Sequence, residues 1–251
     1  MNEDRQAVLV TGALAGIGRA TAEAFARAGA NVVIAGRRPD VGEAFAAELA
    51  SHGGEAGFIA ADVRREAEVQ QLVDRAVERL GRLDVVVNNA GVDGDMVPFA
   101  GVTPESYAGV FDTNVLGTLL GIKHGLRVME PQGSGAIVNV SSIYGEKGFP
   151  LNAPYVASKH AIIGLTRAAA LEGAAYGVRV NAVGPGPVQT AMLDRVTGGD
   201  EDAKAAFLST IPLGRAGDPR EIADAIVFIA SDRAGFLTGQ TVFVDGGLTA
   251  A

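Results

Sequence analysis

The sequence contains no cysteine, which excludes disulfide bonds, thiolate catalysis and cysteine-based metal sites. Basic residues are outnumbered, with 21 lysines and arginines against 29 acidic residues and a net charge of −8. Beyond the pairs Arg37-Arg38 and Arg64-Arg65 there is no basic cluster, so neither nucleic acid nor an anionic membrane is an expected partner. No apolar run reaches the ~18 residues that cross a bilayer, and no signal peptide precedes the first strand-like segment. We therefore expect a soluble, cytoplasmic protein.

The abundant residues indicate a large buried sheet. Of 251 residues, 48% are hydrophobic and 34 are glycine, which suits a parallel sheet joined by tight turns. Strand-like apolar segments alternate with helix-length amphipathic ones along the whole chain, which predicts an α/β fold with helices on both faces of the sheet. No linker or repeat interrupts this pattern, so we expect one domain over residues 1–251. The expected strands are 7–11, 31–35, 57–61, 83–88, 136–141, 178–183 and 240–244; the expected helices are 17–28, 41–52, 66–80, 104–129 (stopped near Pro131), 155–176, 190–196, 202–209 and 219–230.

The segment Tyr155-Val-Ala-Ser-Lys159 carries the clearest chemistry. It opens an apolar, alanine-rich run, so it is expected in the first turns of a helix, where side chains four apart share a face. A phenol with a pKa of about 10 is a poor base at neutral pH, but a nearby lysine charge favours the phenolate and is expected to lower that pKa. Ser142 could then hold a carbonyl oxygen while Tyr155 gives or takes the proton. Taken alone, Tyr-x-x-x-Lys indicates an ordinary surface helix instead.

A glycine-rich loop, Thr11-Gly12-Ala-Leu-Ala-Gly16-Ile-Gly18, joins the first expected strand to its helix. Glycines there allow a tight turn and a close backbone approach, and a helix N-terminus offers free amides to a pyrophosphate. Such a loop can also be a plain turn, but its place after the first strand favours a dinucleotide site.

Together these motifs resemble those of the short-chain dehydrogenase/reductase family. The resemblance rests on Thr11-Gly12-x-x-x-Gly16-x-Gly18, Asn88-Asn-Ala-Gly91, Ser142 and Tyr155-x-x-x-Lys159, and it continues to Pro185-Gly186 and Val244-Asp-Gly-Gly247. It implies a seven-stranded doubly wound (Rossmann) sheet, a nicotinamide cofactor and oxidoreduction at an alcohol or ketone. It does not identify the substrate.

Carried over by position, the catalytic set of the family falls on Asn114, Ser142, Tyr155 and Lys159. In the family the asparagine perturbs its helix and anchors a water connected to the lysine; the alternative for Asn114 is a solvent-facing polar residue. Ser142 rather than Ser141 matches the motif, and Ser141 is expected to be structural. Tyr155 is the expected general acid and base, with Lys159 also holding the nicotinamide ribose.

Further cofactor contacts follow from the same resemblance. Asp62 and Val63 match the pair beside the adenine, although Asp62 could instead cap the helix near Glu66, and Asn88 could serve to lock the sheet. Thr190 matches the residue that bonds the nicotinamide carboxamide. The expected cofactor-binding residues are Gly12, Gly16, Ile17, Gly18, Arg37, Arg38, Asp62, Val63, Asn89, Ala90, Gly91, Tyr155, Lys159, Pro185, Gly186, Val188 and Thr190.

The end of the second strand bears on the choice between NAD and NADP. NAD-specific members place an acid there to accept both ribose hydroxyls. This chain reads Ala35-Gly36-Arg37-Arg38, and guanidinium groups bind a phosphate dianion well, so NADP(H) is preferred and NAD(H) remains open. Ala15 stands where many NADP users carry a basic residue, and Asp40 could turn back toward the ribose.

The expected activity is interconversion of a ketone and a secondary alcohol. Substrate contacts are expected from residues 93–99, 143–151 and 186–212, within a loop region at about 185–217; the named candidates are Asp93, Asp95, Met96, Phe99, Ile143, Tyr144, Phe149, Leu151, Met192, Leu193, Arg195 and Phe207. The alternatives are an NAD-linked sugar or hydroxysteroid dehydrogenase, a 3-oxoacyl thioester reductase, and a non-enzymatic dinucleotide sensor.

Assembly and metal content complete the expectations. Ala157, Ala161, Gly164, Leu165 and Ala168 give the Tyr155 helix a face of small and apolar residues, and the family assembles through this helix and the one carrying Asn114, so a homotetramer is expected. His52, His124 and His160 are taken as structural. Some alcohol dehydrogenases of this family bind magnesium through their C-terminal residue. Here the chain ends Thr249-Ala250-Ala251, with no metal-liganding side chain beyond Thr249, so no metal is expected.

Overall fold

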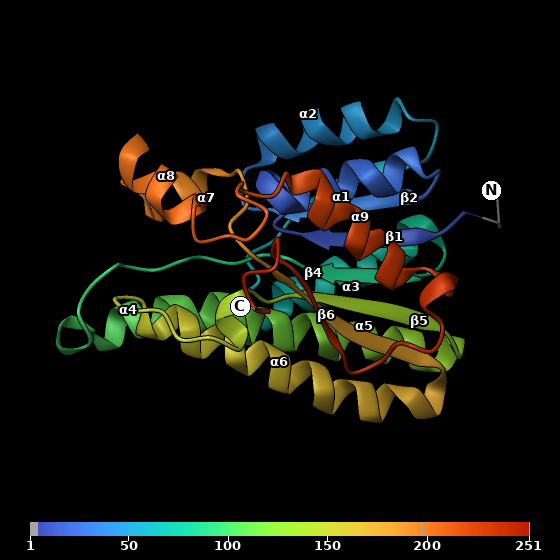
Figure 1. The fold of residues 1–251 in the computed structure, drawn as a ribbon. Helices are drawn as coiled ribbons and strands as arrows, with labels where there is room; N and C mark the ends of the chain where they lie inside the picture. Colours follow the sequence, from blue (N-terminus) through green and yellow to red (C-terminus); the bar gives the residue numbers. More distant parts are fainter. Residues whose placement is uncertain (1–4, 197, 251) are drawn as a thin grey trace.

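In the computed structural model, which describes residues 5–196 and 198–250, seven parallel strands form one sheet in the order β3-β2-β1-β4-β5-β6-β7 (Figure 1). The prediction of a doubly wound, seven-stranded parallel sheet is confirmed. Ala251, the last residue of the sequence and the end of the expected domain, lies outside the described residues. The strands are β1 (Ala7–Thr11), β2 (Asn31–Gly36), β3 (Ala56–Ala60), β4 (Val85–Asn88), β5 (Gly135–Val140), β6 (Val178–Pro185) and β7 (Thr241–Val244).

The central strands are buried throughout and mostly apolar because helices cover both of their faces. Every residue of β1 and of β4 is buried, and Val8 of β1 pairs with Val32 on one side and Val85 on the other. A strand with only one covered face would instead alternate apolar and polar residues. The uninterrupted apolar runs therefore position β1 and β4 at the centre of the sheet.

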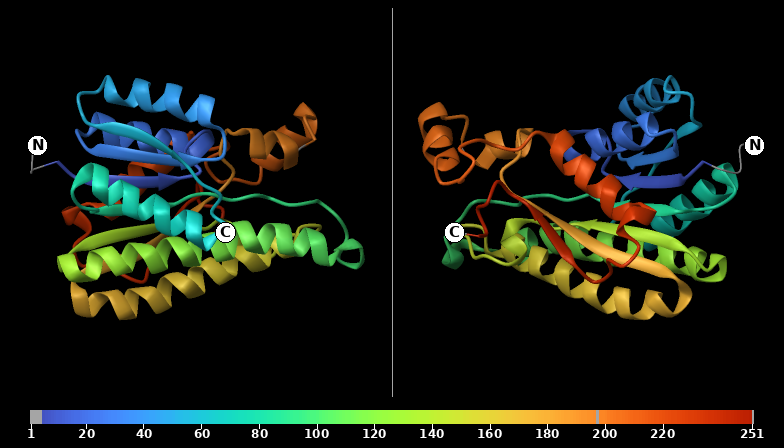
Figure 2. Two further views of the ribbon diagram at one scale, coloured as in Figure 1. Left: turned by 180° about the vertical axis from the view of Figure 1, so that it is seen from behind. Right: turned by 45° about the vertical axis from the view of Figure 1, so that its right-hand side comes forward.

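The helices form two layers, visible in Figures 1 and 2. One core cluster lies between the sheet and α1, α2 and α9, and includes Phe25, Phe45 and Ile222; the other lies under α3, α5 and α6, and includes Leu72 and Met129. The helices are α1 (Gly16–Arg27), α2 (Pro39–Ala50), α3 (Glu66–Leu80), α4 (Pro104–Phe111), α5 (Gly117–Gln132), α6 (Ala153–Gly173), α7 (Ala191–Val196), α8 (Glu201–Leu208) and α9 (Pro219–Ala230). Short 3-10 turns lie at η1 (Phe99–Gly101), η3 (Ile143–Gly145), η4 (Ala174–Tyr176) and η5 (Asp232–Ala234).

The long helical region expected over about residues 104–129 is present but differs from expectation in two respects. A π-helical turn, η2 (Asp112–Leu116), separates α4 from α5, and α5 continues through Pro131 to Gln132. Proline is tolerated there because it stands in the last turn, where Gly133 in the left-handed region (φ 69°) ends the helix. Other element ends differ from expectation by a few residues; α6, for example, starts at Ala153 because Pro154 suits a first helical turn.

The strand order reverses between β1 and β4, and the chain leaves these two neighbours toward opposite faces. Beyond the carboxyl ends of the strands, α7 and α8 (orange) project from the body of the molecule, on the same side as α4 (Figure 2). In the described part of the chain, no helix has the length and apolar character needed to cross a membrane. The geometry thus leaves a crevice at the carboxyl edge of the sheet, where parallel α/β sheets bind ligands.

Candidate active site

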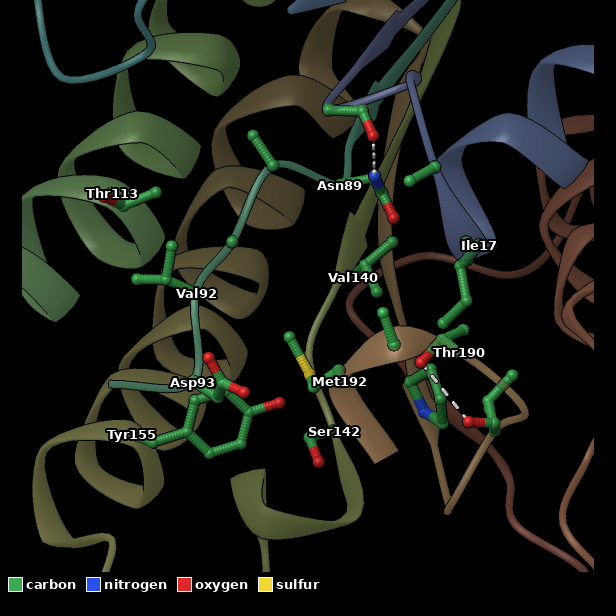
Figure 3. Close-up of a pocket in the computed structure, with 18 of the residues that line it drawn as sticks. Ile17, Asn89, Val92, Asp93, Thr113, Val140, Ser142, Tyr155, Thr190 and Met192 are labelled. Carbon is green, nitrogen blue, oxygen red and sulfur yellow. Dashed lines mark hydrogen bonds between the residues drawn. The ribbon is translucent and has the colours of Figure 1, made fainter. Parts of the chain in front are cut away.

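A cavity of about 510 Å³ opens at this edge, with walls from the loops that follow β1 through β6 and from α6 and α7 (Figure 3). Of the predicted site residues, only Gly18 and Asn114 lie behind its wall. The others line it: Gly12, Gly16, Ile17, Arg37, Arg38, Asp62, Val63, Asn89, Ala90, Gly91, Ser142, Tyr155, Lys159, Pro185, Gly186, Val188 and Thr190. Residues far apart in sequence are therefore brought into one chamber.

Tyr155 and Ser142 lie near each other on the wall of this cavity (Figure 3). Tyr155 stands in the first turn of α6, and Ser142 follows β5 directly. The Ser142 oxygen accepts the backbone N–H of Tyr144 at 3.2 Å. Because the backbone holds the Ser142 oxygen, its proton is left to donate. Ser141 points elsewhere: its hydroxyl donates to the carbonyl oxygen of Lys159 at 2.9 Å.

Lys159 lies one helical turn beyond Tyr155, with its Nζ atom 5.4 Å from the centre of the tyrosine ring. Nζ donates to the carbonyl oxygen of Val140 at 2.9 Å. Desolvation by burial raises the pKa of Tyr155 to about 12, with the hydrogen bond from Ser142 acting in the opposite direction, and desolvation lowers the pKa of Lys159 to about 8. The expected lowering of the pKa of Tyr155 is therefore not observed for the polypeptide, because burial penalises the phenolate more than its neighbours stabilise it. Tyr155 is protonated at neutral pH.

Asn114 holds the loop that follows β4. Its side chain is fully buried in the π-turn η2, so the alternative of a solvent-facing residue is wrong. Its Oδ1 accepts the N–H of Val92 at 2.8 Å, and its Nδ2 donates to the carbonyl oxygen of Val92 at 2.9 Å and to Ser158 Oγ at 3.0 Å. A π-turn adds a residue to one helical turn and so re-aims a side chain. This one clamps Val92 and joins it to α6.

Asn88 belongs to the sheet rather than to the cavity. Its Nδ2 donates to Oδ1 of Asn139 at 2.9 Å, and Nδ2 of Asn139 donates to Thr166 Oγ1 at 2.9 Å. Thr166 donates in turn to the carbonyl oxygen of Ile162 at 2.8 Å. This buried chain of hydrogen bonds ties β4, β5 and α6 together, as the second of the two readings of Asn88 predicted.

The glycine loop has the geometry of a phosphate cradle. Gly12 adopts φ 63°, and a Cβ atom on it would lie 2.7 Å from the Cα of Ala90. A Cβ on Gly18 would lie 2.3 Å from Nδ2 of Asn89, the atom that donates to the carbonyl oxygens of Thr11 and Gly12 at 3.0 Å each. Helix α1 begins without a side-chain cap, so its first N–H groups face the cavity edge free for an anion. These residues fit the pyrophosphate of a dinucleotide.

The part of the cavity at the end of β2 is basic. Arg37 and Arg38 are exposed at the end of β2, and Arg64 binds the Asp62 carboxylate through Nε (2.9 and 3.0 Å) and Nη2 (2.5 Å). The hydrogen bond from Arg64 lowers the pKa of Asp62 to about 2, with a smaller contribution from Arg37. The alternative role of Asp62 as a helix cap is wrong, because Arg65 occupies the cap position of α3 without a side-chain cap bond.

The segment after β6 closes the cavity next to the glycine loop. A Cβ on Gly186 would lie 2.7 Å from the Cα of Asp245, which explains the close passage of the chain there. Thr190 donates to the carbonyl oxygen of Val188 at 3.3 Å, and its Cγ2 lies 3.2 Å from where a Cβ on Gly16 would stand. Thr190 thus lies between the glycine loop and α7.

The remaining wall is mostly apolar. Six of the expected substrate contacts line it: Ile143, Tyr144, Phe149, Met192, Leu193 and Phe207. Asp95, Met96, Phe99 and Leu151 do not, which corrects the expectation for them. The chain turns outward at Gly94 (φ 71°), and Phe99 is 82% exposed as a result.

Arg64 and Asn152 are among the cavity-lining residues that the sequence motifs did not indicate. Arg64 gave a signal only as half of a basic pair, although it stands two residues after Asp62. Asn152 precedes the first residue of α6 but makes no side-chain cap bond, and its buried Oδ1 has no hydrogen-bond partner among the described residues. Beside it, Leu151 adopts φ 66°, a conformation that branched or bulky residues rarely take.

Comparison with known proteins decides the family. Residues 12–249 match a family model of short-chain dehydrogenases whose description is enoyl-(acyl carrier protein) reductase. The chain belongs to the short-chain dehydrogenase/reductase family. It is 40% identical over 244 residues to 2,5-dichloro-2,5-cyclohexadiene-1,4-diol dehydrogenase of Sphingobium indicum, covering 97% of this chain and 96% of that protein. It is 43% identical over 242 residues to cis-4-hydroxycyclohexanecarboxylate dehydrogenase of Sinomonas cyclohexanicum, covering 96% of each.

A solved structure of the same family, levodione reductase, superimposes with a TM-score of 0.94 at 35% identity and 98% coverage of both chains. The protein is thus an NAD(P)-dependent short-chain dehydrogenase/reductase acting on CH–OH and C=O groups.

Proposed function

We propose that this protein interconverts a ketone and a secondary alcohol with NADP(H), using Tyr155 as general acid and base and Ser142, Lys159 and Asn114 beside it. The observation that carries the proposal is that Tyr155 and Ser142 lie around one space of the cavity (Figure 3), with the Lys159 ammonium one helical turn away. A non-enzymatic dinucleotide sensor would have no use for this arrangement.

The protein residues handle one proton and the carbonyl oxygen. In reduction, Ser142 and Tyr155 both donate hydrogen bonds to the carbonyl oxygen, which stabilises the developing alkoxide. Tyr155 then gives up its proton, and the burial that keeps it protonated suits this direction. In oxidation the phenolate must form first, and Lys159 is the nearest cation. The nicotinamide, when bound, supplies or accepts the hydride.

NADP(H) is proposed over NAD(H) from the charges at the end of β2. Gly36 closes that strand where an NAD-specific site needs a carboxylate, and Arg37 and Arg38 follow it exposed. Asp62, the acid that lines this end, is already held by Arg64. A 2′-phosphate would meet guanidinium groups, which bind it by forked, charge-assisted hydrogen bonds.

For the substrate we propose a cyclic secondary alcohol or the corresponding ketone. The wall beside Tyr155 and Ser142 is apolar, and Tyr144 stacks on Phe149 with ring centres 4.6 Å apart. The two named relatives act, by their names, on six-membered carbon rings that bear a hydroxyl group. The description of the family model favours a thioester substrate instead, and sugar or hydroxysteroid dehydrogenation with NAD is the other alternative.

At the level of the whole chain we propose one cytoplasmic domain over residues 1–251, with substrate bound by residues of about 185–217, and a homotetramer. Exposed leucines on the helical face opposite the sheet support the assembly: Leu119 of α5 is 39% exposed and Leu171 of α6 is 82% exposed. A tetramer with two-fold axes needs a second contact surface, for which Phe228 and the fully exposed Phe236 near the edge strand β7 are available.

The role of Tyr155 is tested by Tyr155→Phe, assayed with cyclohexanone, a sugar and an acetoacetyl thioester, each with NADPH and with NADH. Loss of a general acid lowers turnover about 10²- to 10⁴-fold, while NADPH binding, measured by fluorescence titration, stays near the parent value. Tyr107→Phe, on the exposed face of α4 outside the cavity, is the matched control. Turnover of Tyr155→Phe within about tenfold of the parent would contradict the role.

A further inference from the structure

An ion pair spans the substrate end of the cavity. Arg195 of α7 and Asp93 of the loop after β4 both line it, and Nε and Nη2 of Arg195 each lie 3.1 Å from Oδ2 of Asp93. The Asp93 side chain is 18% exposed and that of Arg195 is 58% exposed. Both guanidinium contacts go to the same carboxylate oxygen. Within the described part of the chain, Oδ1 of Asp93 accepts no hydrogen bond.

Asp93 is held in place from both sides. Asn114 clamps both backbone groups of the preceding residue, Val92, at 2.8 and 2.9 Å. The following residue, Gly94, turns the chain away with φ 71°. A polar group on a backbone held this firmly is pre-organised, so a ligand that uses it spends little free energy on ordering the protein.

The Asp93 carboxylate faces the same chamber as the reacting groups. In Figure 3, Asp93, Tyr155, Ser142 and Met192 surround one space. The Asp93 charge also acts on the Tyr155 phenol, as a contribution to its raised pKa after the larger effect of desolvation. A carboxylate oxygen facing an otherwise apolar wall is best satisfied by a hydroxyl donor.

We propose that Asp93 is a specificity-determining residue that accepts a hydrogen bond from a second hydroxyl group of the substrate. The site then selects cyclic diols, and the matching hydroxy ketones, over simple cyclic alcohols. It also disfavours hydroxy carboxylates, whose negative charge would meet Asp93 and would have to displace it from Arg195. This inference rests on the proposed function and names its substrate class more narrowly.

The test compares three probes, cyclohexanol, cyclohexane-1,4-diol and 4-hydroxycyclohexanecarboxylate, by kcat/KM at saturating cofactor. The parent is expected to prefer the diol to cyclohexanol and cyclohexanol to the carboxylate. Asp93→Ala should lower the diol-to-cyclohexanol ratio about 10- to 100-fold, the effect of losing one hydrogen bond to a charged group. Asp93→Asn keeps a hydrogen-bond acceptor without the charge. Its diol-to-cyclohexanol ratio should therefore lie between those of the parent and Asp93→Ala, and its carboxylate-to-cyclohexanol ratio should exceed that of the parent.

Arg195→Ala distinguishes binding of the substrate by Asp93 from a purely structural role of the Asp93–Arg195 ion pair, such as holding α7 against the loop after β4. It breaks the same ion pair as Asp93→Ala but keeps the acceptor, so the diol-to-cyclohexanol ratio should stay near the parent value. If the diol-to-cyclohexanol ratio falls equally in Arg195→Ala and Asp93→Ala, the ion pair has a structural role and the proposal is overturned. An unchanged diol-to-cyclohexanol ratio in Asp93→Ala would also overturn it. Asp95→Asn, in the same loop but outside the cavity, controls for surface charge. A parent that oxidises none of the three probes contradicts the proposed function itself, whereas equal use of cyclohexanol and diol contradicts this inference alone.

Discussion

At the scale of single residues, burial governs how Tyr155 works. Its pKa is raised to about 12, chiefly by desolvation, so the protonated form predominates at neutral pH. Alcohol oxidation requires the deprotonated form, whose fraction rises tenfold per pH unit below the pKa. We therefore expect log kcat/KM for oxidation to rise with a slope near one from about pH 6 to about pH 8 and to level off above it, because Lys159, with its pKa lowered to about 8, then loses the charge that stabilises the phenolate. A pH profile at saturating NADP⁺ measures it, and a flat profile over that range would show that another step or group sets the rate.

The proposed preference for NADP(H) depends on Arg37. Replacing it with alanine removes a charge-assisted contact to the 2′-phosphate of NADPH, worth about 1.5–3 kcal/mol, or one to two orders of magnitude in Kd. The Kd for NADH should barely change, because its ribose carries no phosphate. Titrations of both cofactors measure the two constants. Arg65→Ala is the control, since Arg65 belongs to the other basic pair and lies outside the cavity, bound to Glu68 at 3.1 Å. A parent that already binds NADH more tightly would overturn the assignment.

We expect complete inversion of this proposed preference to need two substitutions. A carboxylate from Gly36→Asp would repel the phosphate and accept the ribose hydroxyls of NADH. A Cβ on Gly36, however, would lie 2.6 Å from Cδ1 of Leu14, which covers the strand end. Leu14→Ala provides the space, so the double variant should invert the preference and the single variant should do so less completely.

At the scale of elements, the contact between α5 and β4 is the tightest constraint. Gly121 of α5 lies so close to the sheet that a Cβ on it would stand 1.9 Å from Oδ1 of Asn88. Gly121→Ala should therefore push α5 away and break the Asn88–Asn139 bond, at a cost of about 1–3 kcal/mol. Gly109→Ala on α4, where a Cβ meets nothing within 4 Å, should stabilise by about 0.5–1 kcal/mol. Thermal denaturation at equal protein concentration compares them, and equal melting temperatures would contradict the packing argument.

Sequence patterns predict the elements because apolar runs and glycine stops are local signals. Helix α3 and strand β1 have the expected ends, since Gly81 stops the one and every residue of the other is apolar or buried. The apolar spacing does not reveal the π-turn at Asp112–Leu116, because it continues that of α4; only the resemblance, which implies that Asn114 perturbs its helix, indicated a disturbance there. Features that depend on distant parts of the chain could not be predicted either: the position of Leu14 over Gly36, the Oδ1 of Asn152, which no described residue bonds, and the burial that raises the pKa of Tyr155. Motif spacing placed the site residues, but only the fold places Arg64 and separates Phe99 from the cavity.

At the scale of the whole molecule, the exposed apolar surface of α5 and α6 should be buried between subunits. Leu119 borders a groove between these helices that also contains Leu165 and Ala168. Leu119→Glu would place a charge in that contact, which is costly without a partner, so the proposed tetramer should dissociate to dimers or monomers. Light scattering on the parent and the variant measures the mass. A parent that is monomeric at micromolar concentration would refute the tetramer, whatever the variant does.

The position of α7 and α8 has a consequence for how such a protein can change over evolutionary time. No described residue of either helix belongs to the two large core clusters, although Met192, Leu193 and Phe207 all line the cavity. Mutations in these helices therefore alter what the cavity accepts without weakening the cores that hold the sheet. Descendant proteins that keep the glycine loop and Tyr155 can therefore change substrate specificity through mutations in α7 and α8, while the sheet and its two core clusters stay the same.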